Sequence, residues 1–582
     1  MFAGLRELQS SEAIRWYRQE VIGKTNKEGK IMYKQIFIDQ CGYLPHMKKE
    51  VTFCAEEPVS FAVHRVDGTC VYIGTADRRI ENASAGETNY VGDFSTVTES
   101  GLFFVHAIGL GESDSFFISE NALFEVFQSS MAFFYFQRCG HELPEKAAGI
   151  YAHEPCHTGH ARVYGREELR EVTGGWHDAG DYGRYVGPGA MAVAQLLYAL
   201  ERGEALCGRY RSPENIGFAA ASLTPSAADF AARPGDPSDY LEELKYELDW
   251  MLKLQREDGA LYHKVSCPNF CGFIMPEEET DELVLSPVSV TATADFAAVC
   301  AMAVRFYKGF DEAYARRLEA ASQKAYEAMK KMDIPGGFKN PDGITTGEYG
   351  DSCDTDERYW AAAELYKAFG DEMYRKDFEE LAREKIYHGY GWSDMGSYGN
   401  LAYLSTERPV DEALQRAIRQ SMIDLADRIL QIAESDGYGT ALTEKQYVWG
   451  SNLLVSNNGL HLYDAWKLTG ERRYLDAAEA QLHYLLGRNS MGLCFVSGCG
   501  TYSIRHPHHR PSVAQGKAMP GMLSGGPCRW FADETIKELF SGKSAPAPAK
   551  CLLDMNGSYS TNEVTIYWNS SFLQLLASVG CA

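Results

Sequence analysis

The sequence predicts a mainly α-helical protein that is preceded by a small β-sandwich. Three observations predict this fold class. Short apolar runs broken by turn residues fill residues 33–123, apolar side chains three and four residues apart recur in residues 124–582, and two long loops interrupt that helical part. Long loops inside a compact domain are usually functional, so we expect the helices to form a barrel with a cleft at one end.

Residues 33–123 are expected to form an antiparallel β-sandwich. Its strands are expected at six apolar runs, at residues 36–38, 51–53, 59–63, 70–73, 102–106 and 115–118. We expect a structural module packed on its neighbour rather than an independent sugar-binding domain. Residues 1–32 are polar and form a separate N-terminal extension, and either Met1 or Met32 is the native start.

The helical part is expected to contain about a dozen helices. Apolar residues at positions 240, 241, 244, 248, 251 and 252 line one face of a helix, and those at 475, 478, 482, 485 and 486 do the same. Other helical stretches are 191–200, 293–307, 313–329, 357–369, 414–432 and 564–576. The long loops are residues 335–356 and 498–529.

Composition and charge exclude several classes of protein. The chain has 582 residues, of which 45% are apolar, which is enough for a large core and excludes a mainly disordered chain. With 56 Lys and Arg against 80 Asp and Glu, the net charge of −24 repels phosphate backbones and anionic lipids, so we expect no nucleic acid and no membrane partner. The oligomeric state stays open.

The cysteines and the first residues bear on the compartment. The 15 cysteines are odd in number and scattered, which is more typical of a reducing compartment than of an extracellular one. The first 30 residues carry charges throughout, so we expect no signal peptide and a cytoplasmic location, unless a leader has been removed.

The first candidate site is residues 174–185, where Asp178 and Asp181 lie three residues apart among glycines and aromatic residues. Two such carboxylates make a negatively charged pocket wall. A polar turn that only caps the next helix would also explain them.

Two more candidate sites lie near the C-terminus. Glu563 follows a polar segment, and an exposed glutamate in the first turn of a helix capped by Thr561 or Asn562 is the alternative. Residues 505–510 read Arg-His-Pro-His-His-Arg, which in so acidic a chain indicates a loop that orients a ligand. His509 is expected to be a packing residue of this loop.

Together these residues resemble family 9 glycoside hydrolases, in the subgroup with an immunoglobulin-like domain ahead of the catalytic domain. The resemblance covers nearly the whole chain from Gln35 onward. It rests, in order, on Asp-Gln-Cys-Gly-Tyr-Leu-Pro at 39–45, Asp-Ala-Gly-Asp at 178–181, Tyr-His-Lys-Val at 262–265, Met-Pro-Glu at 275–277, Thr-Ala-Thr-Ala-Asp-Phe at 291–296, Tyr-Val-Trp-Gly-Ser-Asn at 447–452, His-His-Arg at 508–510 and Thr-Asn-Glu at 561–563. It implies an (α/α)6 barrel and hydrolysis of β-1,4-glucosidic bonds with inversion at the anomeric carbon.

By this resemblance Glu563 is the catalytic acid, Asp181 is the base, and Asp178 helps to hold the attacking water. An inverting enzyme needs such a pair of carboxyl groups, roughly 6.5–9.5 Å apart, with the water between them. Glu563 must then be protonated when substrate binds, which requires a raised pKa. Asp178 and Asp181 disfavour double ionisation unless hydrogen-bond donors surround them.

The resemblance also assigns His508 and Arg510 to hydrogen bonding of sugar hydroxyls. The C–H face of a sugar ring is apolar, so aromatic side chains near the site are candidates for stacking on it. Taken singly, each of them is more often a core residue. The candidates are Trp176, Tyr182, Trp449, Tyr559 and Trp568.

One metal site is expected, and a second set of residues has a metal site as one of two interpretations. Cys139, Cys156, His157 and His177 form the kind of tetrahedral set that zinc prefers, and relatives with the sandwich domain carry a structural zinc at matching positions. Four unconnected buried side chains are the alternative. A catalytic zinc is disfavoured because four protein ligands leave no position for water.

The second set is the oxygen-rich loop with Asp351, Asp354, Asp356 and Glu357, a kind of loop in which family members often hold calcium. An acidic helix N-terminus ahead of Arg358 would explain it as well.

Two departures from the family pattern affect the functional prediction. Asn569-Ser570-Ser571 stands where relatives commonly have Asn-Ala-Pro, and the chain shows no cellulose-binding or docking appendage. We therefore expect an endoglucanase that acts on cellodextrins or soluble β-glucan. An exo-acting β-glycosidase, including one for glucosamine-containing oligosaccharides, and a non-catalytic carbohydrate-binding protein are the alternatives, although a binding protein has no need for opposed carboxylates.

Overall fold

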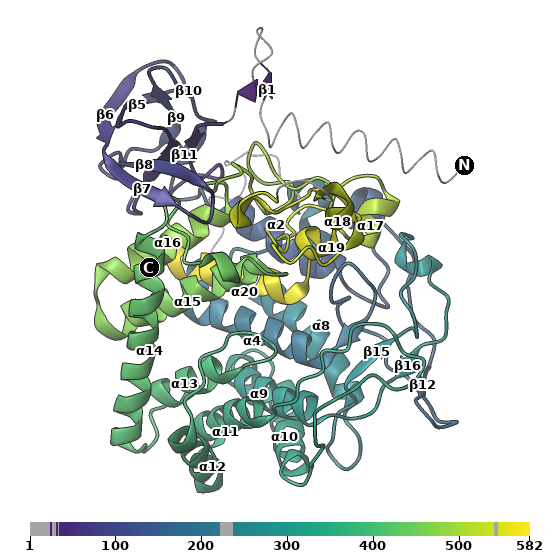
Figure 1. Ribbon diagram of the computed structural model, residues 1–582. Helices are drawn as coiled ribbons and strands as arrows, with labels where there is room; N and C mark the ends of the chain where they lie inside the picture. Colours follow the sequence, from purple (N-terminus) through teal and green to yellow (C-terminus); the bar gives the residue numbers. More distant parts are fainter. Residues whose placement is uncertain (1–23, 26–30, 33, 222–236, 541–544) are drawn as a thin grey trace.

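A computed structural model describes residues 24–25, 31–32, 34–221, 237–540 and 545–582. Within them a β-sandwich is followed by a large helical domain, so the predicted fold class is confirmed (Figure 1). Of the expected N-terminal extension, only β1 (Lys24–Thr25) and β2 (Ile31–Met32) are described, and they pair antiparallel. The remainder of that extension lies outside the described residues.

Two antiparallel sheets form the sandwich, with strand orders β3-β4-β8-β7 and β10-β9-β5-β6, and β11 pairs with β9. In β5 the alternate residues Val59, Phe61 and Val63 point into the core between the sheets. The strands are β3 (Ile36–Phe37), β4 (Glu50–Cys54), β5 (Val59–Arg65), β6 (Cys70–Ala76), β7 (Arg78–Asn82), β8 (Glu87–Asp93), β9 (Gly101–Ala107), β10 (Gly111–Glu112) and β11 (Phe116–Ile118).

Strands β7 and β8 were not among the six predicted runs. In β7 only Ile80 and Asn82 are buried and the other residues are exposed and charged, so no apolar run marks this strand. Such strands gain their stability from pairing in the sheet rather than from their own composition.

Twelve helices of ten or more residues follow in the described part of the chain, close to the predicted number. Six of them form an inner set, in which successive members contact one another from α20 through α4, α9 and α11 to α13, while α15 packs on α20. Helices α8, α10, α12, α14 and α16 bury mainly one face against this inner set, and α2 packs on α20. The helices therefore form the two concentric rings of an (α/α)6 barrel.

The bounds of these helices are α2 (Phe124–Phe136), α4 (Val186–Arg202), α8 (Ser238–Leu254), α9 (Val290–Tyr307), α10 (Glu312–Met329), α11 (Thr355–Phe369), α12 (Glu372–Glu384), α13 (Gly396–Ser405), α14 (Glu412–Glu434), α15 (Ser451–Thr469), α16 (Arg472–Leu485) and α20 (Ile566–Gly580). By length and composition α9 is apolar enough to cross a membrane, but 83% of it is buried inside the protein, so it is a core helix.

A sheet of short strands lies beside the barrel ring and carries part of the candidate site (Figure 1). Its order is β13-β12-β16-β15-β14. The strands are β12 (Ala161–Val163), β13 (Leu169–Arg170), β14 (Arg184–Tyr185), β15 (Lys264–Ser266) and β16 (Val284–Leu285). Short helices in the loops are α3 (Glu145–Ala148), α5 (Glu204–Cys207), α6 (Pro213–Ile216), α7 (Phe218–Ala221), α17 (Arg510–Ala514), α18 (Glu534–Phe540) and α19 (Tyr559–Asn562).

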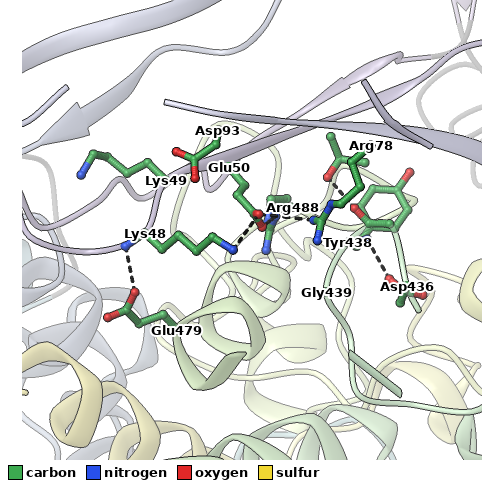
Figure 2. A network of polar contacts seen from close by, with 12 residues as sticks. Lys48, Lys49, Glu50, Arg78, Asp93, Asp436, Tyr438, Gly439, Glu479 and Arg488 are labelled. Atoms are coloured by element: carbon green, nitrogen blue, oxygen red, sulfur yellow. Dashed lines mark hydrogen bonds and ion pairs between the residues drawn. The ribbon is translucent and has the colours of Figure 1, made fainter. Parts of the chain in front are cut away.

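Charged residues join the sandwich to the barrel (Figure 2). The carboxylate of Glu50, on β4, lies 2.9 Å from Arg488 Nη1, 2.9 Å from Lys48 Nζ and 3.3 Å from Arg78 Nη2. Burial alone would raise the pKa of Glu50, but the charges of Arg488, Lys48 and Arg78 lower it to about 2. The backbone N–H of Lys48 donates to Glu479 Oε2 of α16 at 2.9 Å.

The segment at 39–45 belongs to the same interface. Asp39 Oδ2 lies 2.7 Å from His483 Nδ1, and Gln40 Oε1 accepts hydrogen bonds from the backbone N–H groups of Thr501 and Tyr502 at 3.0 and 2.8 Å. The sandwich is therefore anchored to the loop of residues 498–529, which also carries His508 and Arg510.

Candidate active site

The turn at residues 174–185 connects the segment after α2 to β14 and α4. A Cβ atom on Gly180 would lie only 2.0 Å from the backbone oxygen of His508, so only glycine fits there. The backbone N–H of Arg510 donates to Gly180 O at 3.1 Å. The turn with the two aspartates and the histidine-rich loop are thus held against each other.

Asp178 is buried in this turn. Tyr349 OH donates to its Oδ2 atom at 2.5 Å, and its Oδ1 atom has no hydrogen-bond partner among the described residues. Burial, followed by the negative charge of Asp181, raises the pKa of Asp178 well above its ordinary value, although the hydrogen bond from Tyr349 lowers it. The surroundings of Asp178 therefore favour its protonated form.

Asp181 lies in a different polar environment. Its Oδ2 atom accepts hydrogen bonds from the backbone N–H of Gly183 at 3.0 Å and from Tyr185 OH at 3.2 Å. The two aspartates therefore differ in their hydrogen-bond donors, which are one tyrosine hydroxyl for Asp178 and a backbone N–H together with a second tyrosine hydroxyl for Asp181.

Glu563 directly follows α19 and faces the same site. Its strand-like backbone bridges His508, and the backbone N–H of Gly525 donates to its carbonyl oxygen at 2.8 Å. Its side chain keeps a partly exposed edge, and Trp449 Nε1 donates to its Oε2 atom at 3.1 Å. Burial and then the charges of Asp181 and Asp178 raise the pKa of Glu563 well above its ordinary value.

The alternative of a capping role for this segment does not match the structure. Helix α20 begins at Ile566, and its N-cap is Thr565, whose side chain accepts from the backbone N–H of Trp568 at 3.1 Å. Glu563 therefore lies before the cap, and neither Thr561 nor Asn562 caps this helix.

His508 and Arg510 both lie at the site but differ in the donors they can offer. His508 Nδ1 lies 2.6 Å from the carbonyl oxygen of Asn556, which can only accept, and burial lowers the pKa of His508, so its Nε2 atom is left as an acceptor. The guanidinium of Arg510 donates to Gly180 O at 2.6 Å and to Cys271 O at 3.0 Å. Arg510 therefore ties loops together.

His509 is a packing residue in the structure, as expected. It is buried, with its ring nitrogens 2.8 Å from Ser512 Oγ and 3.1 Å from Gln137 Oε1.

The predicted stacking residues fall into two groups. Trp449 is 41% exposed and its ring lies 5.2 Å from that of the partly exposed Tyr559, so these two rings border the site. Trp176 is fully buried and donates from Nε1 to Glu243 Oε1 at 3.0 Å, and Tyr182 is buried with its hydroxyl 2.5 Å from Ile274 O. Neither offers a ring face to a ligand, so the predictions for Trp176 and Tyr182 are wrong, and Trp568 is buried as well.

Sequence reasoning missed three aromatic residues of the site. Tyr349 and Tyr185 hold the two aspartates, and Phe273, which is 40% exposed, packs edge-on against His508 with ring centroids 5.3 Å apart. Tyr349 lies in the long loop 335–356 and Tyr185 lies in the aspartate segment. Both segments were predicted to be functional, so these two tyrosines could have been considered from the sequence. No pattern in the sequence distinguished Phe273.

The four predicted zinc ligands converge. Cys139 Sγ lies 3.7 Å from His157 Nδ1, Cys156 Sγ lies 3.8 Å from His177 Nε2, and all four donor atoms lie within 4.8 Å of one another. Zinc bonds of about 2.3 Å to sulfur and 2.0 Å to nitrogen would place S and N about 3.6 Å apart at a tetrahedral angle. His157 Nε2 is also 2.9 Å from Glu279 Oε2, the outer carboxylate contact typical of a metal-binding histidine. The residues therefore fit zinc.

The acidic loop only partly matches its prediction. Both carboxylate oxygens of the buried Glu357 lack hydrogen-bond partners among the described residues, as do Oδ2 of Asp351 and Oδ1 of the buried Asp295, which the sequence prediction missed. Burial and nearby carboxylates raise the pKa of Asp356 to about 6. Asp354 instead accepts from Arg358 Nη2 at 3.0 Å, as the helix N-terminus alternative expects. Carboxylate oxygens are the ligand type that calcium prefers, but among the described residues the oxygens of this loop do not converge within 4.8 Å as the zinc ligands do.

The chain is similar to known proteins over most of its length. The family model for glycosyl hydrolase family 9 matches residues 124–576, and that for the cellulase N-terminal ig-like domain matches residues 32–112. A cellodextrinase of Butyrivibrio fibrisolvens is 37% identical over 94% of this chain and 100% of the relative.

Two solved structures are similar to this one. One is AaCel9A in complex with cellobiose-like isofagomine, with a TM-score of 0.85 and 34% identity over 94% of this chain and 100% of that one. The other is a Zn-binding triple mutant of the family 9 endoglucanase J30, with a TM-score of 0.83 and 30% identity over 92% of this chain and 99% of that one.

Proposed function

Because the chain belongs to glycosyl hydrolase family 9 and is a glycoside hydrolase, we propose that it cleaves β-1,4-glucosidic bonds in cellodextrins or soluble β-glucans with inversion at the anomeric carbon. One observation carries the proposal. A carboxyl group with a raised pKa, Glu563, lies near the carboxyl pair of a separate turn, Asp178 and Asp181. Differently tuned carboxyl groups are what an inverting hydrolase requires.

Glu563 is the general acid of the proposed reaction. Its raised pKa favours the protonated form, which can donate a proton to the departing glycosidic oxygen. Because Trp449 Nε1 donates to Oε2, the proton is carried by Oε1. The Trp449 contact therefore orients the acid.

Asp181 is the general base, and Asp178 helps to position the water. The ionised Asp181 carboxylate takes a proton from a water that attacks the anomeric carbon from the face opposite the leaving group. The raised pKa of Asp178 favours its protonated form, which can donate a hydrogen bond to the same water without adding a second negative charge. Attack on that face inverts a β-linkage, so the first product is the α-anomer.

The proposed substrate contacts come from the exposed edge of the site. His508 Nε2 accepts a hydrogen bond from a sugar hydroxyl, and the rings of Trp449 and Tyr559 offer apolar faces to the sugar. A soluble oligosaccharide substrate in the cytoplasm is supported by the cysteines, none of which forms a disulfide although all 15 lie in the described residues.

We propose a structural zinc at Cys139, Cys156, His157 and His177. Zinc there would fix the segment after α2 against His177, the neighbour of Asp178. Metal analysis is expected to find one zinc per chain, and Cys156→Ser is expected to lose it and to melt at a lower temperature. The control Cys207→Ser, a buried cysteine in α5, is expected to keep the zinc.

We also propose calcium at Glu357 and Asp356, with Asp295 and Asp351 nearby. The supporting observation is the set of buried carboxylate oxygens without hydrogen-bond partners among the described residues. Calcium is expected to raise the melting temperature of the wild type and of Asp354→Asn, but not that of Glu357→Gln. An equal response of all three proteins would contradict this site.

The central test combines product analysis with two variants. Wild-type enzyme on defined cello-oligosaccharides is expected to release new reducing ends, and NMR is expected to detect the α-anomer first. Asp181→Asn and Glu563→Gln are each expected to lose at least about 100-fold in kcat. Wild-type turnover in either variant, or a β-anomer as first product, would overturn the assignment. The product lengths separate endo from exo action.

A further inference from the structure

Lys264 is a buried cation next to the candidate active site. It lies in β15 with essentially no exposed surface. Its Nζ atom donates to Thr346 Oγ1 at 3.1 Å, to Thr346 O at 3.3 Å and to Gly347 O at 2.6 Å. An ammonium group has three N–H donors, so all of them are used, and every acceptor is neutral. No hydrogen-bonded carboxylate neutralises its charge within the described residues.

The charge of Lys264 is directed toward Asp181 through one aromatic ring. Strands β14 and β15 place Tyr185 directly opposite Lys264, and Lys264 Nζ lies 5.5 Å from the centre of the Tyr185 ring. The hydroxyl at the other end of that ring donates to Asp181 Oδ2 at 3.2 Å. A cation on the ring face and a carboxylate at its hydroxyl form one connected electrostatic unit.

The other titratable groups near Lys264 are either neutral or bound to other partners. On its own strand, His263 stays neutral because burial lowers its pKa to about 3. On the adjoining loop, Glu348 is held by Lys339 Nζ at 3.2 Å and by the backbone N–H of Asn340 at 3.0 Å.

Across the site, the other charged or acidic groups have partners of their own. Asp178 accepts from Tyr349 OH, Glu563 accepts from Trp449 Nε1, and Arg510 is a second cation whose guanidinium donates to backbone carbonyls. Asp181 is the carboxylate that Tyr185 links to Lys264.

We propose that Lys264 is a positioning residue for the catalytic base, whose buried charge acts on Asp181 through the ring of Tyr185 and whose hydrogen bonds hold the loop that carries Tyr349. This inference rests on the proposed function, because it assigns the base role to Asp181. Burial lowers the pKa of Lys264 to about 8, while the charges of Asp181 and Glu348 oppose that shift, so the ammonium persists over the acidic and neutral range.

The pH profile of kcat/KM tests this role, because its acid limb reports the free enzyme's base. Two charges separated by several ångströms in a partly buried site interact by about 1.4 kcal/mol, which is about one pH unit. In Lys264→Met the acid limb is expected to move to higher pH by about one unit. Lys264→Arg, which keeps the charge, is expected to return the limb toward its wild-type position.

Other outcomes separate the possible failures. A uniform loss of kcat in Lys264→Met with an unmoved acid limb would overturn the electrostatic role and leave only loop support. Absence of hydrolysis in the wild type would instead refute the proposed function itself. If Lys264→Met fails to fold, as judged by circular dichroism, Lys264→Gln replaces it, because its amide can still donate to Thr346 O and Gly347 O. The same shift is expected.

Discussion

Glu50 at the domain interface and Glu563 in the candidate active site are both largely withdrawn from water, yet they differ in ionisation. Three cations surround Glu50, and its pKa is lowered to about 2. Glu563 accepts a hydrogen bond from one indole N–H and lies near two other carboxyl groups, and its pKa is raised. Burial of a carboxyl group is common to both, so the surrounding charges decide which one is a structural anion and which one is an acid.

The two glutamates also contribute to stability with opposite sign. A depressed pKa in the folded state means that Glu50 stabilises the fold above its ordinary pKa of 4.5 and that this contribution is lost as the pH falls toward about 2. A raised pKa means that Glu563 costs stability as the pH rises above 4.5. A rise in pH thus increases the contribution of Glu50 to the stability of the fold and decreases that of Glu563.

The largest expected effect comes from removal of the acid. Glu563→Gln is expected to lower kcat on a soluble cellodextrin by about 10³-fold, because the amide cannot donate the proton. Its melting temperature is expected to equal or exceed that of the wild type, since an unfavourable buried acid has been removed. A large loss of stability in this variant would show that Glu563 is compensated like Glu50.

Glu50→Gln is expected to give the reverse result. Removal of the carboxylate leaves the buried Arg488 without its partner, so the free energy of unfolding is expected to fall by about 3 kcal/mol, measured by urea denaturation. The value of kcat is expected to stay within about twofold of the wild type. Glu81→Gln, which removes an exposed partner of Arg79 in the same sandwich, is the control and is expected to cost less than about 1 kcal/mol.

The sequence predicted these two regions unequally. The sandwich and the helical part could be predicted from short patterns of residues, and the resemblance to family 9 glycoside hydrolases pointed to the zinc ligands and to Asp178, Asp181 and Glu563. The interface network could not, because Glu50 and Arg488 are 438 residues apart and nothing local indicates their contact.

The same limit explains the errors. Trp176 is buried because Glu243, on a distant helix, accepts its indole N–H, and Asp295 joins the acidic loop only through helix packing. A tryptophan beside an aspartate gives no sign of whether its ring is exposed. Long-range burial is decided by tertiary packing, which a single sequence does not display.

A smaller effect is expected when the stabilities of the wild type and of Glu50→Gln are compared at acidic pH. Between pH 4.5 and pH 2, protonation of Glu50 removes its ion pairs in the wild type, but Glu50→Gln has none to lose. The stability difference between the two proteins is therefore expected to narrow by about 2 kcal/mol over this range. Thermal melts at several pH values measure it, and a constant difference would mean that the three cations do not act through the charge of Glu50.

The smallest expected effect concerns Trp449, the one hydrogen-bond donor to the Glu563 carboxyl group among the described residues. The N–H of Trp449 stabilises the charged form of Glu563 and so lowers its pKa, in opposition to burial. In Trp449→Phe the alkaline limb of kcat/KM is therefore expected to move to higher pH by about half a unit, with a loss of about threefold to tenfold in kcat from poorer orientation of the acid. Trp530→Phe, which changes another exposed tryptophan, is the control and is expected to leave the limb in place. A shift toward lower pH in Trp449→Phe would mean that the indole N–H favours the protonated acid, and the contrast with the cation-bound Glu50 would then need a different cause.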